Sequence, residues 1–382
     1  MPVRGNAVVN DNLNPDLQKK YFRIFENELP IMLFGKKKVR IIGLDVGSRT
    51  LKVAEITEAK QGYTLKKFGI GEIDPGLIED GTIKNPEAVA DGIRQLFKMY
   101  KIKEPNIALS IGGYSIIVKT ITVKSMSENK LGEQIQVEAE TYIPFDISDV
   151  NIDFQILGEN IENSDEMDVL LVAAKKEIVS DYEKLVRIAN LNPLIMDVDA
   201  FALQNIYSLN YDTEDENVAL IDIGDSKTTL NILKGDVSVL IRDVSLGCAQ
   251  ITQQVVAQMG CSPEEAEQMY HSSKSDEIPP KELLEILSSV VEGWCKEISR
   301  ALDFFYSTYP GDHIKKIVLS GGGANIRQFR ELLAEETTTE VEIINPFEYF
   351  SLDGSLDAAY LEGIAPQAAI CMGLAMRKAD DK

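Results

Sequence analysis

The chain carries the same short pattern twice, as Gly43-Leu44-Asp45-Val46-Gly47-Ser48 and as Leu220-Ile221-Asp222-Ile223-Gly224-Asp225. In each copy an apolar run leads into an aspartate, and a glycine follows two positions later. The two windows align without gaps, Asp45 on Asp222, at a separation of 177 positions (222 minus 45). Because glycine permits a tight turn directly after a buried strand, both windows predict a strand that ends in a sharp turn.

The residues around each turn continue the match between the two windows. Alternating apolar residues on both sides of the turns are typical of β-hairpins. The predicted strands are residues 39–46, 51–57 and 63–70 around the first turn, and around the second a strand from Val218 and strands at residues 228–233 and 237–244. The two regions therefore read as copies of one supersecondary unit, and 382 residues suffice for two halves with a core each.

Helical periodicity separates these strands. From Pro86 apolar residues recur at helical spacing, with Asn85 placed as the N-cap and Pro86 at the first helical position. Further predicted helices are residues 128–140, 176–190, 246–259, 263–270 and 280–306, and further predicted strands are residues 107–111, 152–157, 168–174 and 314–319. The uncharged run 365–376 predicts a buried helix, because a membrane span requires about 18 apolar residues.

Bulk charge and cysteine usage exclude several classes of protein. The formal net charge of -22 repels phosphate backbones and anionic lipid head groups, so nucleic acid is not an expected partner. Four cysteines stand far apart in a chain with two histidines, which argues against a zinc site and for thiols in a reducing cytoplasm. These cysteines are Cys248, Cys261, Cys295 and Cys371.

An aspartate at the end of a buried strand, followed by a glycine turn with hydroxyl side chains, suits one kind of ligand. The backbone N–H groups of such a turn bind phosphate, and nearby hydroxyl groups donate hydrogen bonds to phosphoryl oxygens. Asp45 and Asp222 would hold Mg²⁺ mainly through water molecules. The predicted phosphate-binding residues are Gly47, Ser48, Arg49 and Thr50 in the first turn, and Gly224, Asp225, Ser226, Lys227 and Thr228 in the second. One turn alone is weak evidence, and the matched pair carries the prediction.

A third glycine cluster follows the predicted strand at residues 314–319. It comprises Gly321, Gly322, Gly323 and Asn325, and the missing side chains would let a flat base lie against the backbone. The cluster does not match the dinucleotide fingerprint, because Ile326 stands where that pattern requires its last glycine. The alternative is a tight helix entry without a ligand.

Taken together, these parts resemble the actin, sugar-kinase and heat-shock-chaperone ATPase superfamily. The resemblance implies an α/β, actin-like duplicated ATPase fold with two ribonuclease-H-like halves. It gives Asp199 the role of the acidic residue that positions the attacking water, with Asp197 as a substitute, and Glu267 the role of binding the ribose hydroxyls. Either aspartate could instead be a helix N-cap, and Glu267 could lie on an exposed helix face.

Two other segments resemble the PilM family of type IV pilus assembly proteins. They are Gln136-Val137-Glu138-Ala139-Glu140-Thr141-Tyr142-Ile143-Pro144-Phe145, continuing into Val150-Asn151-Ile152-Asp153-Phe154, and Met32-Leu33-Phe34-Gly35-Lys36-Lys37-Lys38. The resemblance implies an adaptor that binds ATP with Mg²⁺, with slow hydrolysis at most. Its implied partners are the N-terminal cytoplasmic tail of PilN, other pilus platform proteins and the assembly motors, at the cytoplasmic face of the inner membrane.

The same resemblance supplies the domain boundaries. The expected units are a first half (39–114), an inserted α/β subdomain of the FtsA type (115–195), a connecting helix and link (196–216), a second half with the adenosine site (217–364), and a second connecting helix with a polar tail (365–382). Residues 1–38 are interpreted as an N-terminal extension, disordered or upstream of a start at Met32. A partner peptide is expected in the groove between the insert and the first half. Tyr142, Ile143 and Phe145 either line that groove or belong to the core.

Two alternatives share the phosphate turns. An FtsA-like filament-forming division scaffold would bind the membrane through an amphipathic C-terminal helix, whereas this chain ends in the polar residues 377–382. A small-molecule kinase would use Asp199 as a base toward a substrate hydroxyl. Self-association and the kinase reading remain open at this level.

Overall fold

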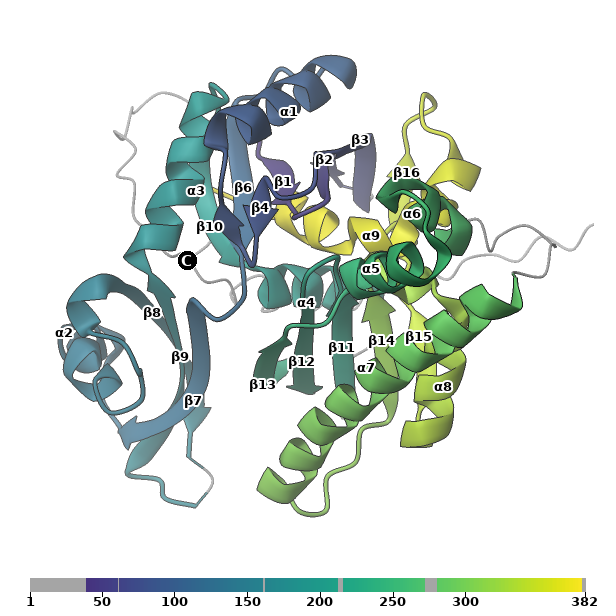
Figure 1. The fold of residues 1–382 in the computed structure, drawn as a ribbon. Coiled ribbons are helices and arrows are strands. Elements are labelled where there is room, and N and C mark those ends of the chain that lie inside the picture. Colours follow the sequence, from purple (N-terminus) through teal and green to yellow (C-terminus); the bar gives the residue numbers. More distant parts are fainter. Residues whose placement is uncertain (1–38, 61, 161, 212–215, 272–279, 380–382) are drawn as a thin grey trace, which may run out of the picture.

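The computed structural model describes residues 39–60, 62–160, 162–211, 216–271 and 280–379. The predicted N-terminal extension and most of the predicted link at residues 212–216 lie outside these ranges. The described chain forms two sheet-and-helix halves, with a smaller three-stranded unit beside the first (Figure 1).

The sheets of the two halves share a five-strand topology, and the first sheet has one further strand at its edge. The first has the order β10-β6-β1-β2-β3-β16 and the second the order β13-β12-β11-β14-β15. The strands of the first are β1 (Ile42–Val46), β2 (Thr50–Ala59), β3 (Gly62–Glu72), β6 (Asn106–Ile111), β10 (Asn192–Val198) and β16 (Phe350–Leu352). Those of the second are β11 (Asn217–Ile223), β12 (Thr228–Lys234), β13 (Val237–Val244), β14 (Lys316–Ser320) and β15 (Glu340–Ile343). In each half an antiparallel meander is followed by parallel strands, which confirms the predicted duplication.

The first half closes its sheet with α1 (Pro86–Met99) and α3 (Lys176–Ile188), next to a small hairpin of β4 (Ile78–Glu79) and β5 (Thr82–Ile83). Helix α1 begins as predicted, because the Asn85 side chain accepts a hydrogen bond from the Ala88 N–H at 3.1 Å. Its apolar residues, among them Ile93 and Leu96, are buried against the sheet.

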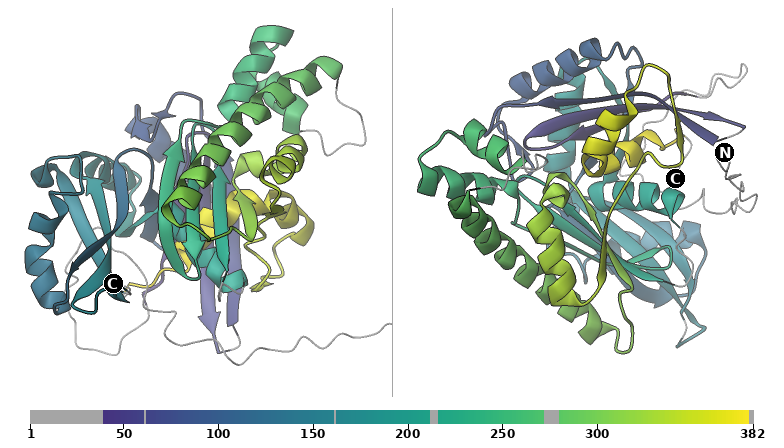
Figure 2. Two further views of the ribbon diagram at one scale, coloured as in Figure 1. Left: turned by 90° about the horizontal axis from the view of Figure 1, so that it is seen from below. Right: turned by 90° about the vertical axis from the view of Figure 1, so that its right-hand side faces the viewer.

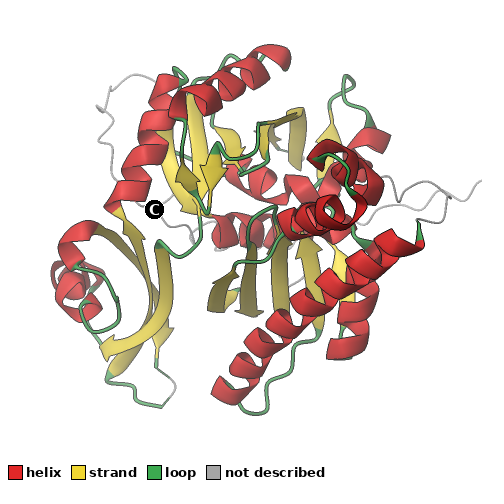
Figure 3. Ribbon diagram, in the orientation of Figure 1, coloured by secondary structure: helices red, strands yellow, loops and turns green. Residues whose placement is uncertain are grey.

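The insert is smaller than predicted. It comprises β7 (Ile116–Lys124), α2 (Glu128–Ala139), β8 (Val150–Glu159) and β9 (Glu166–Lys175). Its sheet has the order β7-β9-β8, and α2 lies on the side away from the second half (Figure 3). The predicted boundary at residue 195 is wrong, because β10 pairs with β6 in the first sheet and α3 packs in the core of the first half.

Tyr142, Ile143 and Phe145 belong to the core of the insert. Ile143 is buried, and the other two side chains pack against the same apolar cluster below α2. Of the two readings of this segment, the structure therefore favours the core.

The second half covers one face of its sheet with α5 (Cys248–Met259), α6 (Pro263–His271), α7 (Lys281–Thr308) and α8 (Arg327–Thr337). Trp294 on α7 lies in the centre of this core against Phe329, with ring centroids 5.4 Å apart. Its indole N–H donates to Gln250 Oε1 on α5 at 2.8 Å, so the buried polar group is satisfied.

Two helices, α4 (Asp199–Asn210) and α9 (Ala358–Ala375), cross between the sheets (Figure 2). Together they form an apolar cluster with strands of both sheets, so one core joins the halves. Helix α9 starts at Ala358 rather than at 365, since Asp357 caps it and Pro366 lies inside it. Strand β16 joins the first sheet, so the predicted second half, 217–364, ends too late.

None of the described helices is long and apolar enough to span a membrane.

The crossing of α4 and α9 depends on Gly373. A Cβ atom there would lie 1.8 Å from the Ala202 carbonyl oxygen, so alanine cannot fit without separating the helices. We expect Gly373→Ala to lower the free energy of unfolding by about 1–3 kcal/mol or more, measured by urea denaturation. Gly293→Ala on α7 is the matched control, because nothing lies within 4 Å of its Cβ position. Gly293→Ala is expected to be neutral or to stabilise by about 0.5–1 kcal/mol. An equal loss of stability in both variants would contradict the close approach of α4 and α9 at Gly373.

Candidate functional site

A cleft lies between the two halves, where both acidic glycine turns meet. Fourteen of the residues predicted from sequence line it: Asp45, Gly47, Ser48, Arg49, Thr50, Asp199, Asp222, Gly224, Asp225, Ser226, Lys227, Glu267, Gly321 and Gly322. They come from strands of both sheets and the turns that follow these strands, from the start of α4 and from α6. The fold thus brings together side chains that are far apart in the sequence.

Four predicted residues do not line the cleft. The Thr228 hydroxyl is buried and donates to the Leu246 carbonyl at 3.0 Å, away from the turn. Gly323 is required for packing, because a Cβ atom there would lie 2.3 Å from Ile223 Cγ2. Asn325 ends a short 3₁₀ helix outside the cleft lining.

Asp197 is the fourth, and its predicted role as a substitute for Asp199 does not fit its position. Its side chain and that of Arg377 are both 0% exposed, and they form an ion pair at 3.2 Å. Asp197 Oδ1 also accepts the Val198 N–H at 2.8 Å. The carboxylate is therefore held inside the protein, where no ligand in the cleft would reach it.

The two turns share one geometry and face one another. The Gly47 N–H donates to the Thr50 carbonyl at 3.1 Å, and the Gly224 N–H donates to the Lys227 carbonyl at 2.9 Å. Ser48 Oγ of the first turn lies 3.3 Å from Ser226 Oγ of the second. The halves are thus closed on each other at the turns.

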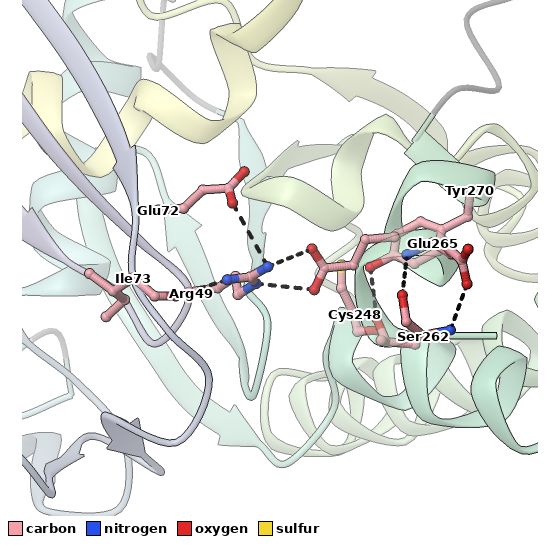
Figure 4. A network of polar contacts seen from close by, with 9 residues as sticks. Arg49, Glu72, Ile73, Cys248, Ser262, Glu265 and Tyr270 are labelled. Carbon is pink, nitrogen blue, oxygen red and sulfur yellow. Dashed lines mark hydrogen bonds and ion pairs between the residues drawn. The ribbon is translucent and has the colours of Figure 1, made fainter.

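Arg49 closes the mouth of the cleft. Its Nε and one terminal nitrogen donate to the two carboxylate oxygens of Glu267 on α6, at 3.0 and 2.9 Å. The other terminal nitrogen donates to the Ile73 carbonyl at 2.8 Å, and a Glu72 carboxylate oxygen lies 3.9 Å from the terminal nitrogen that binds Glu267 (Figure 4). Such a bidentate pair is a strong, charge-assisted contact, and it joins the two halves.

Two lysines neutralise two of the four aspartates that line the cleft. Lys52 donates to Asp45 at 2.8 Å and Lys227 donates to Asp199 at 2.7 Å. Burial alone would raise the pKa of Asp199, but Lys227 and the hydroxyl of Ser110 hold this pKa below its ordinary value. Asp199 is therefore a weak base, and its side chain does not cap α4.

Asp222 is different, because it accepts a hydrogen bond from a hydroxyl group, that of Ser320, at 2.8 Å. Burial, together with the nearby charges of Asp45 and Asp199, raises the pKa of Asp222 to about 6. A cation placed beside this carboxylate would stabilise its charged form and so offset both the burial and the repulsion by the neighbouring aspartates.

The donor set suits Mg²⁺ better than a metal held by protein ligands alone. In the parts of the chain that the structure describes, no three His, Cys, Asp or Glu side chains converge on one point. Asp45 and Asp222 offer two carboxylates in a cleft rich in turn N–H and hydroxyl groups. Mg²⁺ commonly keeps several water molecules and takes its other oxygens from carboxylates and phosphates.

Sequence reasoning missed Lys52 and Ser110, although both leave a signal. Lys52 interrupts an apolar strand directly opposite Asp45 in the hairpin register. Ser110 belongs to a second repeat, because Ile107-Ala108-Leu109-Ser110-Ile111-Gly112-Gly113 matches Ile317-Val318-Leu319-Ser320-Gly321-Gly322-Gly323. Ser110 is the penultimate residue of β6 and Ser320 the last residue of the equivalent strand β14, and each donates to an aspartate of the cleft.

Two sheets that share a five-strand topology, joined by α4 and α9 and closed at paired acidic turns, define a protein of the actin-like ATPase fold. The sequence model of a family described as "Type IV pilus assembly protein PilM" matches residues 43–379. The chain therefore belongs to the PilM family of type IV pilus assembly proteins.

Solved structures agree with this assignment. The chain is similar to one in the structure titled "PilM-PilN type IV pilus biogenesis complex", at 26% identity and a TM-score of 0.80, covering 90% of this chain and 100% of that one. It is also similar to the ethanolamine utilization protein EutJ from Carboxydothermus hydrogenoformans, at 12% identity and a TM-score of 0.54 over 88% of this chain and 89% of the other. The second likeness concerns the fold alone.

Proposed function

We propose that this chain is an ATP-binding adaptor of the type IV pilus assembly platform. It binds ATP with Mg²⁺ in the cleft, docks on the N-terminal cytoplasmic tail of PilN, and links PilN to other platform proteins and the assembly motors. It acts at the cytoplasmic face of the inner membrane through these partners. The observation that carries the proposal is the closed pair of acidic turns in a member of the PilM family.

The cleft offers a group for each part of a magnesium nucleotide. The N–H groups of the two turns and the ammonium groups of Lys52 and Lys227 suit phosphate oxygens. Asp45 and Asp222 would hold Mg²⁺ through water, Glu267 the ribose hydroxyls, and Gly321 with Gly322 the base. Bound Mg²⁺ would supply charge neutralisation for the phosphates.

Slow hydrolysis follows from the state of Asp199. The Ser110 hydroxyl donates to Asp199 and keeps one carboxylate oxygen occupied even when Lys227 turns to phosphate, which leaves Asp199 a poor acceptor for a proton from water. The nucleotide then acts chiefly as a ligand that holds the halves together.

The partner assignment rests on family membership and on the similar chain, whose structure is titled as a complex with PilN. Family membership also favours the adaptor over the filament-forming scaffold and the kinase. A pull-down with a synthetic PilN tail tests it. Retention of the chain supports the proposal, and no retention with or without MgATP contradicts it.

Glu267 provides a test inside the cleft. Glu267→Gln removes the charge that accepts both hydrogen bonds from Arg49, and it weakens the acceptor offered to ribose. We expect ATP affinity to fall about tenfold, equivalent to about 1.4 kcal/mol, in a fluorescence titration. Glu264→Gln changes an exposed carboxylate on the same helix and is expected to leave the affinity unchanged. If Glu267→Gln binds ATP as tightly as Glu264→Gln does, Glu267 is not part of the nucleotide site.

A further inference from the structure

The chain enters the insert at the floor of the cleft. A Cβ atom at Gly112 would lie 2.3 Å from Lys227 Nζ and 2.4 Å from Asp199 Oδ2. Residues 112–114 lead into β7, and we call them the root of the insert. Gly112, the first of them, packs directly on the ion pair between Lys227 and Asp199 and has no room for a side chain of its own. Any movement of Lys227 changes the contact that Gly112 makes.

Gly113 and Tyr114 connect the root to the second half through hydrogen bonds. The Gly113 N–H donates to Asp243 Oδ2 at 2.9 Å, and the Tyr114 hydroxyl lies 3.2 Å from Ser245 Oγ. Asp243 belongs to β13, and Thr229 on β12 donates to its other oxygen. Gly113 has a φ of +89°, which favours glycine, so this hydrogen bond depends on a backbone shape that few residues adopt.

Beside the root lies a cavity of about 350 Å³. Its walls include Ile117 and Val118 of β7 and Ile241 and Val244 of β13. The first strand of the insert, β7, contacts β13 of the second half, and the cavity lies beside this contact, next to Asp243. This space would allow the root to move without displacing a packed core.

We propose that residues 112–114, held by Asp243, couple occupancy of the cleft to the position of the insert. The coupling rests on the proposed nucleotide site. Lys227 has two alternative partners, Asp199 in the present structure or a phosphate oxygen of the ligand. When Lys227 turns to phosphate, Gly112 loses its neighbour, the root shifts, and β7 moves with it. The groove expected to hold the PilN tail borders the insert, so nucleotide and partner would change each other's affinity by the same factor.

Two spin labels test the coupling without any assay of hydrolysis. The labels are attached through Val137→Cys and Lys296→Cys in a Cys261→Ser background. Val137 on α2 is 69% exposed and Lys296 on α7 is exposed, so both positions can carry a label. The distance between the labels is measured by pulsed electron paramagnetic resonance with and without MgATP. The melting temperature of the same samples reports whether MgATP binds.

We expect MgATP to raise the melting temperature and to shift the label distance in the parent protein. In Asp243→Ala the rise should persist, because Asp243 does not line the cleft, while the distance shift should be lost. Asp303→Ala, an exposed aspartate on α7, should retain both. If Asp243→Ala fails to fold, Ser245→Ala removes one contact of the root and should reduce the shift.

The outcomes separate the two proposals. A rise in melting temperature without a distance shift in the parent protein overturns the coupling and leaves the nucleotide site standing. An undiminished shift in Asp243→Ala also overturns it. No rise in the parent protein contradicts the nucleotide site, and with it the coupling that depends on it.

Discussion

Asp222→Asn is expected to raise the stability of the ligand-free protein at pH 7.5 and to abolish most of the stabilisation by MgATP. The pKa of Asp222 is raised from 3.8 to about 6 in the folded protein, mainly by burial, so its charge destabilises the folded state above pH 6. Asparagine removes this charge and keeps an oxygen that can accept from Ser320. The gain should be about 1–3 kcal/mol.

The dependence on pH follows from the same shift. A raised folded-state pKa means that the destabilisation is absent below pH 4, grows as pH rises toward 6 and is complete above it. The difference in melting temperature between Asp222→Asn and the wild-type protein should therefore be small at pH 4 and largest at neutral pH. A loss of ligand-free stability at pH 7.5 would contradict the position of Asp222.

Asp45→Asn is the matched control. Asp45 is paired with Lys52, whose side chain is 11% exposed, so removing the carboxylate leaves a buried ammonium group without its partner. This variant should lose ligand-free stability while it also loses stabilisation by MgATP. Without ligand, Asp222→Asn should gain stability and Asp45→Asn should lose it, whereas both variants should lose the stabilisation by MgATP. This combination distinguishes a metal site from a general effect on folding.

Arg377→Met should be among the most destabilising single changes in the chain. The arginine and Asp197 form a fully buried ion pair, and burial raises the pKa of Asp197 even though Arg377 opposes this rise. Removing the arginine leaves an uncompensated buried carboxylate, which typically costs about 3–5 kcal/mol. The expected result is a large drop in the urea midpoint.

A double variant separates charge from packing. Asp197→Asn combined with Arg377→Met leaves no charge buried, so it should recover much of the stability that Arg377→Met loses. The readout is again the urea midpoint. If the single variant stays within about 1 kcal/mol of the wild-type protein, the account of this pair is wrong.

Much of the fold could be predicted, because its elements depend on local patterns. The two hairpins, the Asn85 cap and most helices follow from periodicity and capping, and they lie close to the predicted positions. Strands β15 and β16 have 4 and 3 residues, too few for a pattern to emerge. The end of the insert was misjudged because the pairing of β10 with β6 is a contact between distant residues, which no local pattern reveals.

The candidate site, like the fold, could be predicted where it depends on local motifs and not where it depends on contacts between distant residues. The glycine turns are local motifs, so nearly all their residues lie in the cleft as expected. Thr228 is the exception, because its hydroxyl turns to the Leu246 carbonyl. The proximity of Asp197 to Asp199 in sequence was misleading, because Asp197 belongs to β10 whereas Asp199 is the first residue of α4, so the chain changes its conformation between them. The partner of Asp197 is Arg377, whose place depends on how α9 ends.

The central claim is that the cleft between the matched turns is a magnesium-nucleotide site. Isothermal titration calorimetry of MgATP into the ligand-free chain tests it most directly. One molecule of ATP should bind per chain, with affinity that falls when Mg²⁺ is chelated and in both Asp45→Asn and Asp222→Asn. No binding, or unchanged affinity in both aspartate variants, would contradict the claim.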